Sequence, residues 1–294
     1  MLILATGIIG ASSLSSCKKE GCVDPKATNY DEKAKKDDGT CEYDTLVIVK
    51  PDVEGLTKIA EVELNNINTN VGIYARGELV TGYNTLYFAA TDPETGNVID
   101  DGHFEVSPMM KMDAGHEHGT PVLNEVLSTV DEKSLYKMGV YFVMSSMGGQ
   151  WRLDFEFHNH AESGHQESTV NVEVAEPSDR ISGNFMAMDD SSMLFACWVM
   201  EEDPIVGMND FTMAIFEREN MMTWTPVNDI NITIEPEMPT MGHGSPGNVN
   251  PTSIGSGQYK GEVNFTMTGY WKVNIEMTRN SNQVSNGFYF DYTL

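Results

Sequence analysis

Basic residues are scarce in this chain. It carries 18 Lys and Arg against 44 Asp and Glu over 294 residues, which gives a formal net charge of −26 at pH 7. Proteins bind nucleic acids and anionic membrane surfaces through basic patches. The composition therefore excludes a general affinity for either, and we expect no nucleic-acid partner.

Motifs of common catalytic sites are missing as well. The chain has no nucleophile elbow, no phosphate-cradling glycine loop after a strand and no HExxH sequence. The HEH at residues 116–118 lies outside any helical pattern, so its glutamate is not presented as the base of a helical metalloprotease would be. We expect a protein that is not an enzyme.

The N-terminus begins with a short apolar run, MLILATGIIGASSLSSC. It is too short to span a membrane as a helix and has the shape of a secretory signal. Leu14 to Cys17 resembles a bacterial lipobox, which implies cleavage of the signal in residues 1–17 and lipidation of Cys17. This resemblance predicts a protein of the cell envelope that is anchored through lipid, at the outer membrane.

Cysteine is rare, with four residues in the chain. Cys22 and Cys41 bracket an acidic segment with almost no aliphatic residues, which cannot bury enough surface to fold unaided. We expect a disulfide between them, in an oxidising compartment. The fourth cysteine, Cys197, lies in the apolar run MLFACWVM, where a buried thiol is expected and a copper ligand is the alternative.

The bracketed segment resembles short acidic modules in surface proteins of Bacteroidetes-like bacteria, and we interpret residues 18–45 as a spacer. Carboxylates suit hard cations such as calcium. A weak calcium site and a solvated spacer both remain open for the acidic residues Asp24, Asp31, Asp37 and Asp38.

The rest of the chain has the pattern of strands. Segments such as WRLDFEF, TVNVEVAE and GEVNFTMT alternate apolar and polar residues, and Gly, Asn or Pro turns separate them. Several short strands in each half predict an all-β fold made of two immunoglobulin-like β-sandwiches. We expect these sandwiches over residues 46–176 and 177–294, with AEPSDR as the linker.

Four blocks of sequence recur in the same order and at nearly constant spacing. LVTGYNTLYFAA matches PIVGMNDFTMAI, FEVSPMM matches ITIEPEM, HGTP matches HGSP, and MGGQWRLDFEF matches MTGYWKVNIEM. This register places Trp151 over Trp271. Such an ordered match indicates two related domains in tandem.

The recurring segments PMMKMDAGHEHGTP and PEMPTMGHGSP gather methionine, histidine and glycine between prolines, as in a loop. Thioether and imidazole donors suit Cu(I) better than Cu(II), and methionine needs no deprotonation and forms no disulfide. We predict a copper site in each half, completed by a methionine ahead of the tryptophan strand. The candidate ligands are Met110, Met112, His116, His118 and Met147 in the first half, and Met238, Met241, His243 and Met267 in the second.

The order of strand, Pro-x-Met, Met/His/Gly segment, HG[ST]P and Met-x-Gly-x-Trp resembles the YtkA-like family, which is related to FixH-like domains. The resemblance covers both halves and is stronger in the second, because the first has an expanded loop and extra residues before Trp151. It implies extracytoplasmic immunoglobulin-like sandwiches associated with copper handling and with cytochrome oxidase biogenesis.

A second histidine group, HNHAESGH, contains His158, His160 and His165. Imidazole suits Cu(II) and Zn(II), whereas an exposed hairpin without metal is the alternative. The group has no counterpart in the second half.

Two functions follow from these patterns. The first is a copper-binding lipoprotein that captures, stores or delivers copper, with an outer-membrane transporter or an oxidase assembly factor as partner. The alternative is a non-catalytic structural or interaction lipoprotein that docks on a membrane protein.

Overall fold

The computed structural model describes residues 19–42 and 48–294. The chain divides into two compact units at Ile48 and Val49, and each is described by itself. In the first unit, the described residues form turns held by the predicted disulfide between Cys22 and Cys41, whose Cα atoms are 4.8 Å apart. The predicted lipidation site, Cys17, lies outside the described residues.

Strands dominate the second unit. The helices of its described residues are two short 3-10 turns, η1 (Asn65–Ile67) and η2 (Ser146–Gly148). No helix in the described parts of the chain is long and apolar enough to cross a bilayer. The predicted all-β fold is confirmed.

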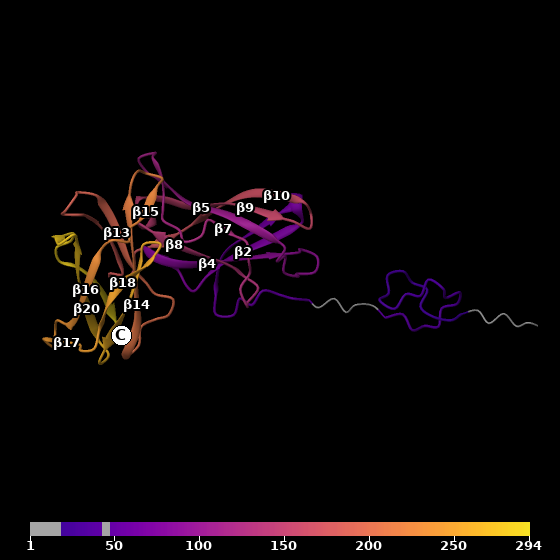
Figure 1. Ribbon diagram of the computed structural model, residues 1–294. Helices are drawn as coiled ribbons and strands as arrows, with labels where there is room; N and C mark the ends of the chain where they lie inside the picture. The colour runs from indigo at the N-terminus through magenta and orange to yellow at the C-terminus, as the bar shows by residue number, and fades with distance from the viewer. Residues whose placement is uncertain (1–18, 43–47) are drawn as a thin grey trace, which may run out of the picture. The chain divides into compact units, whose positions relative to one another are not determined.

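The first half of this unit forms an immunoglobulin-like sandwich of two main sheets (Figure 1). One sheet has the order β1-β2-β4-β8, and the other has the order β10-β9-β5-β6, with β7 paired to β5. A short parallel pair, β11-β3, lies beside them. The strands are β1 (Thr57–Leu64), β2 (Thr69–Ala75), β3 (Leu79–Val80), β4 (Gly82–Thr91), β5 (Gly102–Met112), β6 (Glu117–Gly119), β7 (Val126–Leu127), β8 (Tyr136–Phe142), β9 (Gly149–Asn159), β10 (Gly164–Val172) and β11 (Val174–Ala175).

The alternation of β9 explains how this sandwich forms. Trp151, Leu153, Phe155 and Phe157 are buried, while the residues between them are half-exposed. Successive side chains of a strand point to opposite faces, so one face of β9 enters the core and the other meets solvent. Aromatic rings join the two sheets, as where Phe88 of β4 lies with its ring centroid 6.3 Å from that of Phe155.

The second half repeats the arrangement with the strands drawn in orange to yellow (Figure 1). Its sheets have the orders β12-β13-β14-β19-β18, with β15 paired to β14, and β17-β16-β20-β21, with β22 paired to β20. The strands are β12 (Ser182–Met186), β13 (Met193–Val199), β14 (Gly207–Arg218), β15 (Trp224–Pro226), β16 (Asn231–Met238), β17 (His243–Gly244), β18 (Val249–Gly255), β19 (Gln258–Phe265), β20 (Tyr270–Arg279), β21 (Asn282–Gln283) and β22 (Phe288–Thr293).

The two sandwiches are packed against each other. The core of the first includes Phe195 and Cys197 of β13 and Phe216 of β14. The ring centroid of Phe216 lies 4.7 Å from that of Tyr141 on β8, and the Tyr141 hydroxyl accepts a 2.9 Å hydrogen bond from Gln258 Nε2. Burial of a phenylalanine is worth about 1.5–3 kcal/mol, so this contact stabilises both halves.

Candidate functional site

The first Met/His segment forms a hairpin, and the interpretation of it as a loop is wrong for Met110, Met112 and His118. β5 continues through Met112 and β6 carries His118, so residues 113–116 make the turn. Pairing with β6 and β9 provides hydrogen-bond partners for the backbone, which the residue types did not reveal. Gly115 supplies the left-handed conformation of the turn, with φ of +85°.

Three side chains of this hairpin region form a row across the inner face of the sheet. Met110 lies directly opposite His118 on β6 and directly opposite Trp151 on β9. All three are buried, and residues paired in this way have Cβ atoms about 4.5–5.5 Å apart. The rings of His118 and Trp151 meet edge-on, with centroids 5.3 Å apart. The register therefore places a thioether beside an imidazole inside the sandwich.

The imidazole of His118 is set in one tautomer. Its Nδ1 lies 2.9 Å from the carbonyl oxygen of Gly119, and because a carbonyl only accepts, Nδ1 carries the proton. Nε2 of the neutral ring then holds a lone pair. Among the described residues this buried atom has no hydrogen-bond partner, and the residue is 6% exposed. Metal-bound histidines have this arrangement, with the other ring nitrogen donating to a carbonyl or carboxylate.

A methionine that the sequence did not single out lies at this row. The indole Nε1 of Trp151 donates to the carbonyl oxygen of Met144 at 2.9 Å, as Nε1 of Trp271 donates to Met267 in the second half. A Cβ on Gly148 would lie 2.6 Å from Cε of Met144 and 3.8 Å from Cε of Met110. Met144, not Met147, is therefore the structural counterpart of Met267.

The remaining candidates of the first half differ in their exposure. Met147 lies in η2 and is 89% exposed. His116 is exposed in the hairpin turn, and its carbonyl accepts a hydrogen bond from the backbone of Met112. Met112 is half-buried and lies two residues along β5 from Met110, on the same face. The alignment selected Met147 by a count of four residues back from the tryptophan, whereas the three residues of η2 lie between Met144 and Trp151.

The second half holds the same arrangement in a more open form. Met238 is buried and lies opposite His243, whose ring centroid is 6.0 Å from that of Trp271. Nδ1 of His243 lies 3.0 Å from the carbonyl oxygen of Gly244, which again makes Nδ1 the donor and frees Nε2. His243 is half-exposed. The other two candidates in this half are Met267, which is 39% exposed, and Met241, which is 60% exposed and lies in the hairpin turn.

A hairpin of the second sandwich lies against Gly119, the residue next to His118. We call residues 219–226, between β14 and the end of β15, the cap hairpin. The carbonyl of Met221 accepts a 2.9 Å hydrogen bond from the backbone of Gly119, and Nε1 of Trp224 donates to the Gly119 carbonyl at 3.2 Å. This carbonyl is the one that also accepts from His118. The cap hairpin is thus bonded to the strand that carries His118.

The cysteines and the acidic spacer take no part in these two sites. Cys197 is a free, buried thiol, and its burial raises its pKa, which disfavours the thiolate that would bind a metal. In the described spacer, backbone N–H groups two residues on donate to the carboxylates, and three converging acidic residues are not found there. These acceptors are Asp24, Asp31, Asp37 and Asp38. Calcium binding stays a prediction.

Comparison with known proteins supports part of the sequence interpretation. Residues 198–276 match the family model described as YtkA-like, which covers strands of the second sandwich including His243 and Trp271. A YtkA-like domain is therefore present in this half. No curated protein matches the chain.

Two solved structures illustrate its likeness to other folds. Invasin, a bacterial integrin-binding protein, is 9% identical with a TM-score of 0.25, over 76% of this chain and 38% of invasin. FdeC, an Escherichia coli adhesin, is 14% identical with a TM-score of 0.24, over 79% of this chain and 65% of FdeC. The chain spans less than two thirds of either structure, and TM-scores this low do not relate its function to theirs.

Proposed function

We propose that this chain binds copper as Cu(I) at two sites, one in each sandwich, and serves as a non-catalytic copper carrier or store. The observation that carries the proposal is the buried Nε2 of His118, which has a lone pair, no hydrogen-bond partner among the described residues and the thioether of Met110 as its neighbour. Leaving such an acceptor unsatisfied costs about 1–3 kcal/mol. A bound metal ion would remove that cost.

The donor types support copper over other metals. An imidazole with two thioethers is a soft ligand set that suits Cu(I), whereas zinc and the hard cations prefer more nitrogen or oxygen. In the first site the ligands are His118, Met110 and Met144. In the second they are His243, Met238 and Met267.

The chain's own residues would orient and protect the ion. The carbonyls of Gly119 and Gly244 hold the two imidazoles with Nε2 free. The indoles of Trp151 and Trp271 pack against the imidazoles and donate to the methionine carbonyls, which fixes the turn before each tryptophan strand. In the first site, bound copper would thus be surrounded by buried aromatic and thioether groups that exclude water.

The compartment and the partner belong to the same proposal. The lipobox-like sequence ending at Cys17 supports a lipid anchor in the bacterial cell envelope, at the outer membrane. The disulfide between Cys22 and Cys41 supports an oxidising compartment. A transporter of the outer membrane or an oxidase assembly factor would take or supply the copper.

The test is a competition titration with Cu(I) and a chromophoric chelator. The full chain would carry Cys17→Ser, which keeps it free of lipid. We expect two equivalents of Cu(I) to bind with micromolar or tighter affinity. Both should be lost in a variant with the four substitutions Met110→Leu, His118→Gln, Met238→Leu and His243→Gln.

A matched control uses the same chemical changes at exposed positions. Met147→Leu with His116→Gln removes a methionine and a histidine of the first half but leaves the row of Met110 intact. This variant should bind both equivalents. If the four-site variant binds as the parent does, or if the parent binds more weakly than micromolar, copper binding is wrong. The interaction module of the sequence analysis would then be the better hypothesis.

A further inference from the structure

Three histidines form a row on the outer face of the first sandwich. His103 of β5 lies directly opposite His158 of β9, which lies directly opposite His165 of β10. Their rings stack, with centroids 4.3 Å apart for the first pair and 5.0 Å for the second. Their chain neighbours Phe104 and Phe157 are buried. The row therefore faces away from the core and away from Met110.

A row of carboxylates runs beside the histidines, two residues along each strand. Glu105, Glu156 and Glu167 are directly opposite one another on β5, β9 and β10. Like charges in paired positions destabilise a sheet, by up to about 1 kcal/mol for each pair. The sequence places three of them in line without a lysine or an arginine between them. A bound cation would offset this repulsion.

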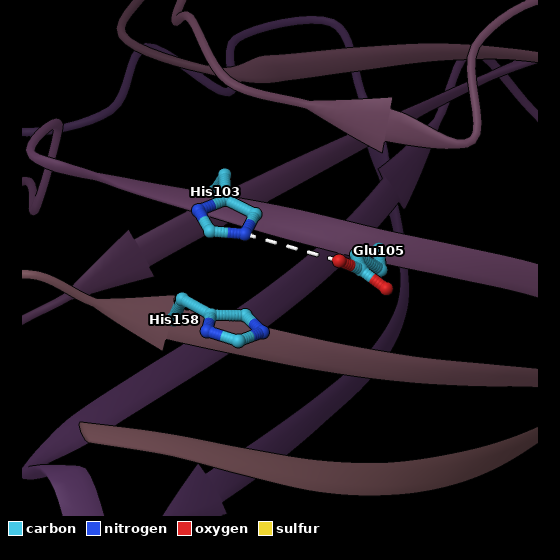
Figure 2. Close-up of side chains that lie close together, drawn as sticks. All are labelled: His103, Glu105 and His158. Carbon is cyan, nitrogen blue, oxygen red and sulfur yellow. Dashed lines mark ion pairs between the residues drawn. The ribbon is translucent and has the colours of Figure 1, made fainter.

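The donor atoms of the two rows converge. Nε2 of His103 lies 4.0 Å from Oε1 of Glu105, with His158 beside them (Figure 2). Oε1 of Glu156 lies 3.4 Å from Nε2 of His158 and 3.4 Å from Nε2 of His165. Two sets of three ligand atoms, each within 4.8 Å of one another, share His158: the first has His103 and Glu105, and the second has Glu156 and His165.

A chain of hydrogen bonds sets the tautomer of His103. Nδ1 of His160 lies 2.9 Å from Oδ1 of Asp101, and the carboxylate only accepts, so Nδ1 is the donor. In the neutral ring, Nε2 of His160 then accepts from Nδ1 of His103 at 3.1 Å. Nε2 of His103 is left with a lone pair on the side of Glu105. His160 and Asp101 thus fix the tautomer of His103, as the hydrogen-bond partners of metal-bound histidines do.

We propose that the outer face of β5, β9 and β10 binds one divalent transition-metal ion, Zn²⁺ or Cu²⁺, through His103, His158 and a neighbouring glutamate. Imidazole and carboxylate suit these ions, and the cluster consists of these two donor types. Ligand atoms around tetrahedral zinc are about 3.4 Å apart, so the present spacing closes with small side-chain rotations. His165 is the further ligand of the second set, which contains His158 and Glu156.

The surroundings favour entry of a cation. A groove of about 600 Å³ lies along the same outer face, and Glu105, Asp154, Glu156 and Glu167 line it. The acidic lining of the groove raises the local concentration of cations. His103 and His158 are only about a quarter exposed, on strands that hold their backbone in place. The ligands are therefore preorganised and still reachable from solvent.

Calorimetric titration of the full chain carrying Cys17→Ser with ZnCl₂, and separately with a Cu²⁺ salt, tests the proposal. We expect one saturable equivalent of either ion. His158→Gln, which removes the ligand that both sets share, should weaken binding on the order of a hundredfold, and Asp101→Asn about tenfold because it acts only on the tautomer of His103. Both residues are on the surface, and circular dichroism will show that the variants keep the fold.

Two controls separate this site from the proposed Cu(I) sites. His116→Gln changes a histidine outside the cluster and should leave Zn²⁺ binding unchanged. Met110→Leu with His118→Gln should also leave it unchanged, while one Cu(I) equivalent is lost. Absence of saturable Zn²⁺ and Cu²⁺ binding, or full binding in His158→Gln, would overturn the outer-face site without touching the Cu(I) proposal. Nitrogen hyperfine couplings of bound Cu²⁺ that disappear in His158→Gln would support it.

Discussion

The two Met/His hairpins have the same side chains in the same row and differ in what covers them. In the first, the cap hairpin bonds to Gly119, and His118 is buried. In the second, no equivalent contact to Gly244 is found among the described residues, and His243 is half-exposed. Similar segments thus carry the same donor types, whereas the exposure of the two histidines to water differs. Under the proposed function, the buried site would hold Cu(I) and the more exposed site would exchange it.

The largest expected difference is in Cu(I) affinity between two variants that each keep only one of the two Met/His sites. Met110→Leu with His118→Gln leaves the open site, and Met238→Leu with His243→Gln leaves the closed one. The closed site should hold Cu(I) on the order of tenfold more tightly, because its donors are already desolvated and His118 has no other partner. Chelator competition measures both affinities. Equal affinities would mean that burial does not distinguish the sites.

Opening the cap should make the first site behave as the second does. Trp224→Ala removes the hydrogen bond to Gly119 and a half-buried ring, at a cost of about 2 kcal/mol of unfolding free energy. Transfer of Cu(I) from the first site to a chelator should become about tenfold faster, a factor that corresponds to 1.4 kcal/mol in the barrier. Stopped-flow absorbance measures it. Met222→Ala, an exposed change in the same hairpin, is the control and should leave the transfer rate unchanged.

Alanine substitutions of two glycines test the positions of the methionines through smaller changes in the free energy of unfolding. A Cβ on Gly269 would lie 2.7 Å from Cε of Met238, at φ of +129°, whereas a Cβ on Gly148 would lie 2.6 Å from Cε of Met144. Gly269→Ala should cost about 1–3 kcal/mol because the backbone is strained as well. Gly148→Ala should cost less, since the flexible Met144 can shift. Urea denaturation compares them. A greater loss for Gly148→Ala would contradict this account.

Substitutions of Met144 and Met147 should have the smallest effects, and only the first should change the affinity for Cu(I). Met144→Leu should weaken Cu(I) binding at the first site alone. Met147→Leu should change neither affinity nor stability, because that side chain is 89% exposed. The same titration distinguishes them. Weaker Cu(I) binding in Met147→Leu, with no change in Met144→Leu, would mean that Met147 is the ligand, as the sequence alignment predicts.

The fold was largely predictable, because alternation along a strand is local. WRLDFEF shows which face of β9 is buried before any partner is known. The disulfide of the spacer was also predictable from a single segment, because Cys22 and Cys41 bracket it. The candidate sites were predictable only in part. His118, Met110, His243 and Met238 were selected as candidates from composition, whereas Met144 was missed because the three residues of η2 lie between it and Trp151.

His103 shows the limit most clearly. In the sequence it is a single histidine far from HNHAESGH, and nothing in its neighbours indicates a partner. The register of β5 against β9 places it opposite His158. Register depends on the pairing of whole strands, and a slip of one residue would turn His103 into the core.

The sequence by itself determined the strand character of the chain, the spacer disulfide and the types of donor available to a metal. Those properties follow from residue chemistry and from periodicity within single segments. The tertiary structure decided which methionine lies beside Trp151, that the cap hairpin bonds to Gly119, and that three strands align their histidines on one face. These depend on contacts between segments far apart in the chain, which only the packed sheets bring together.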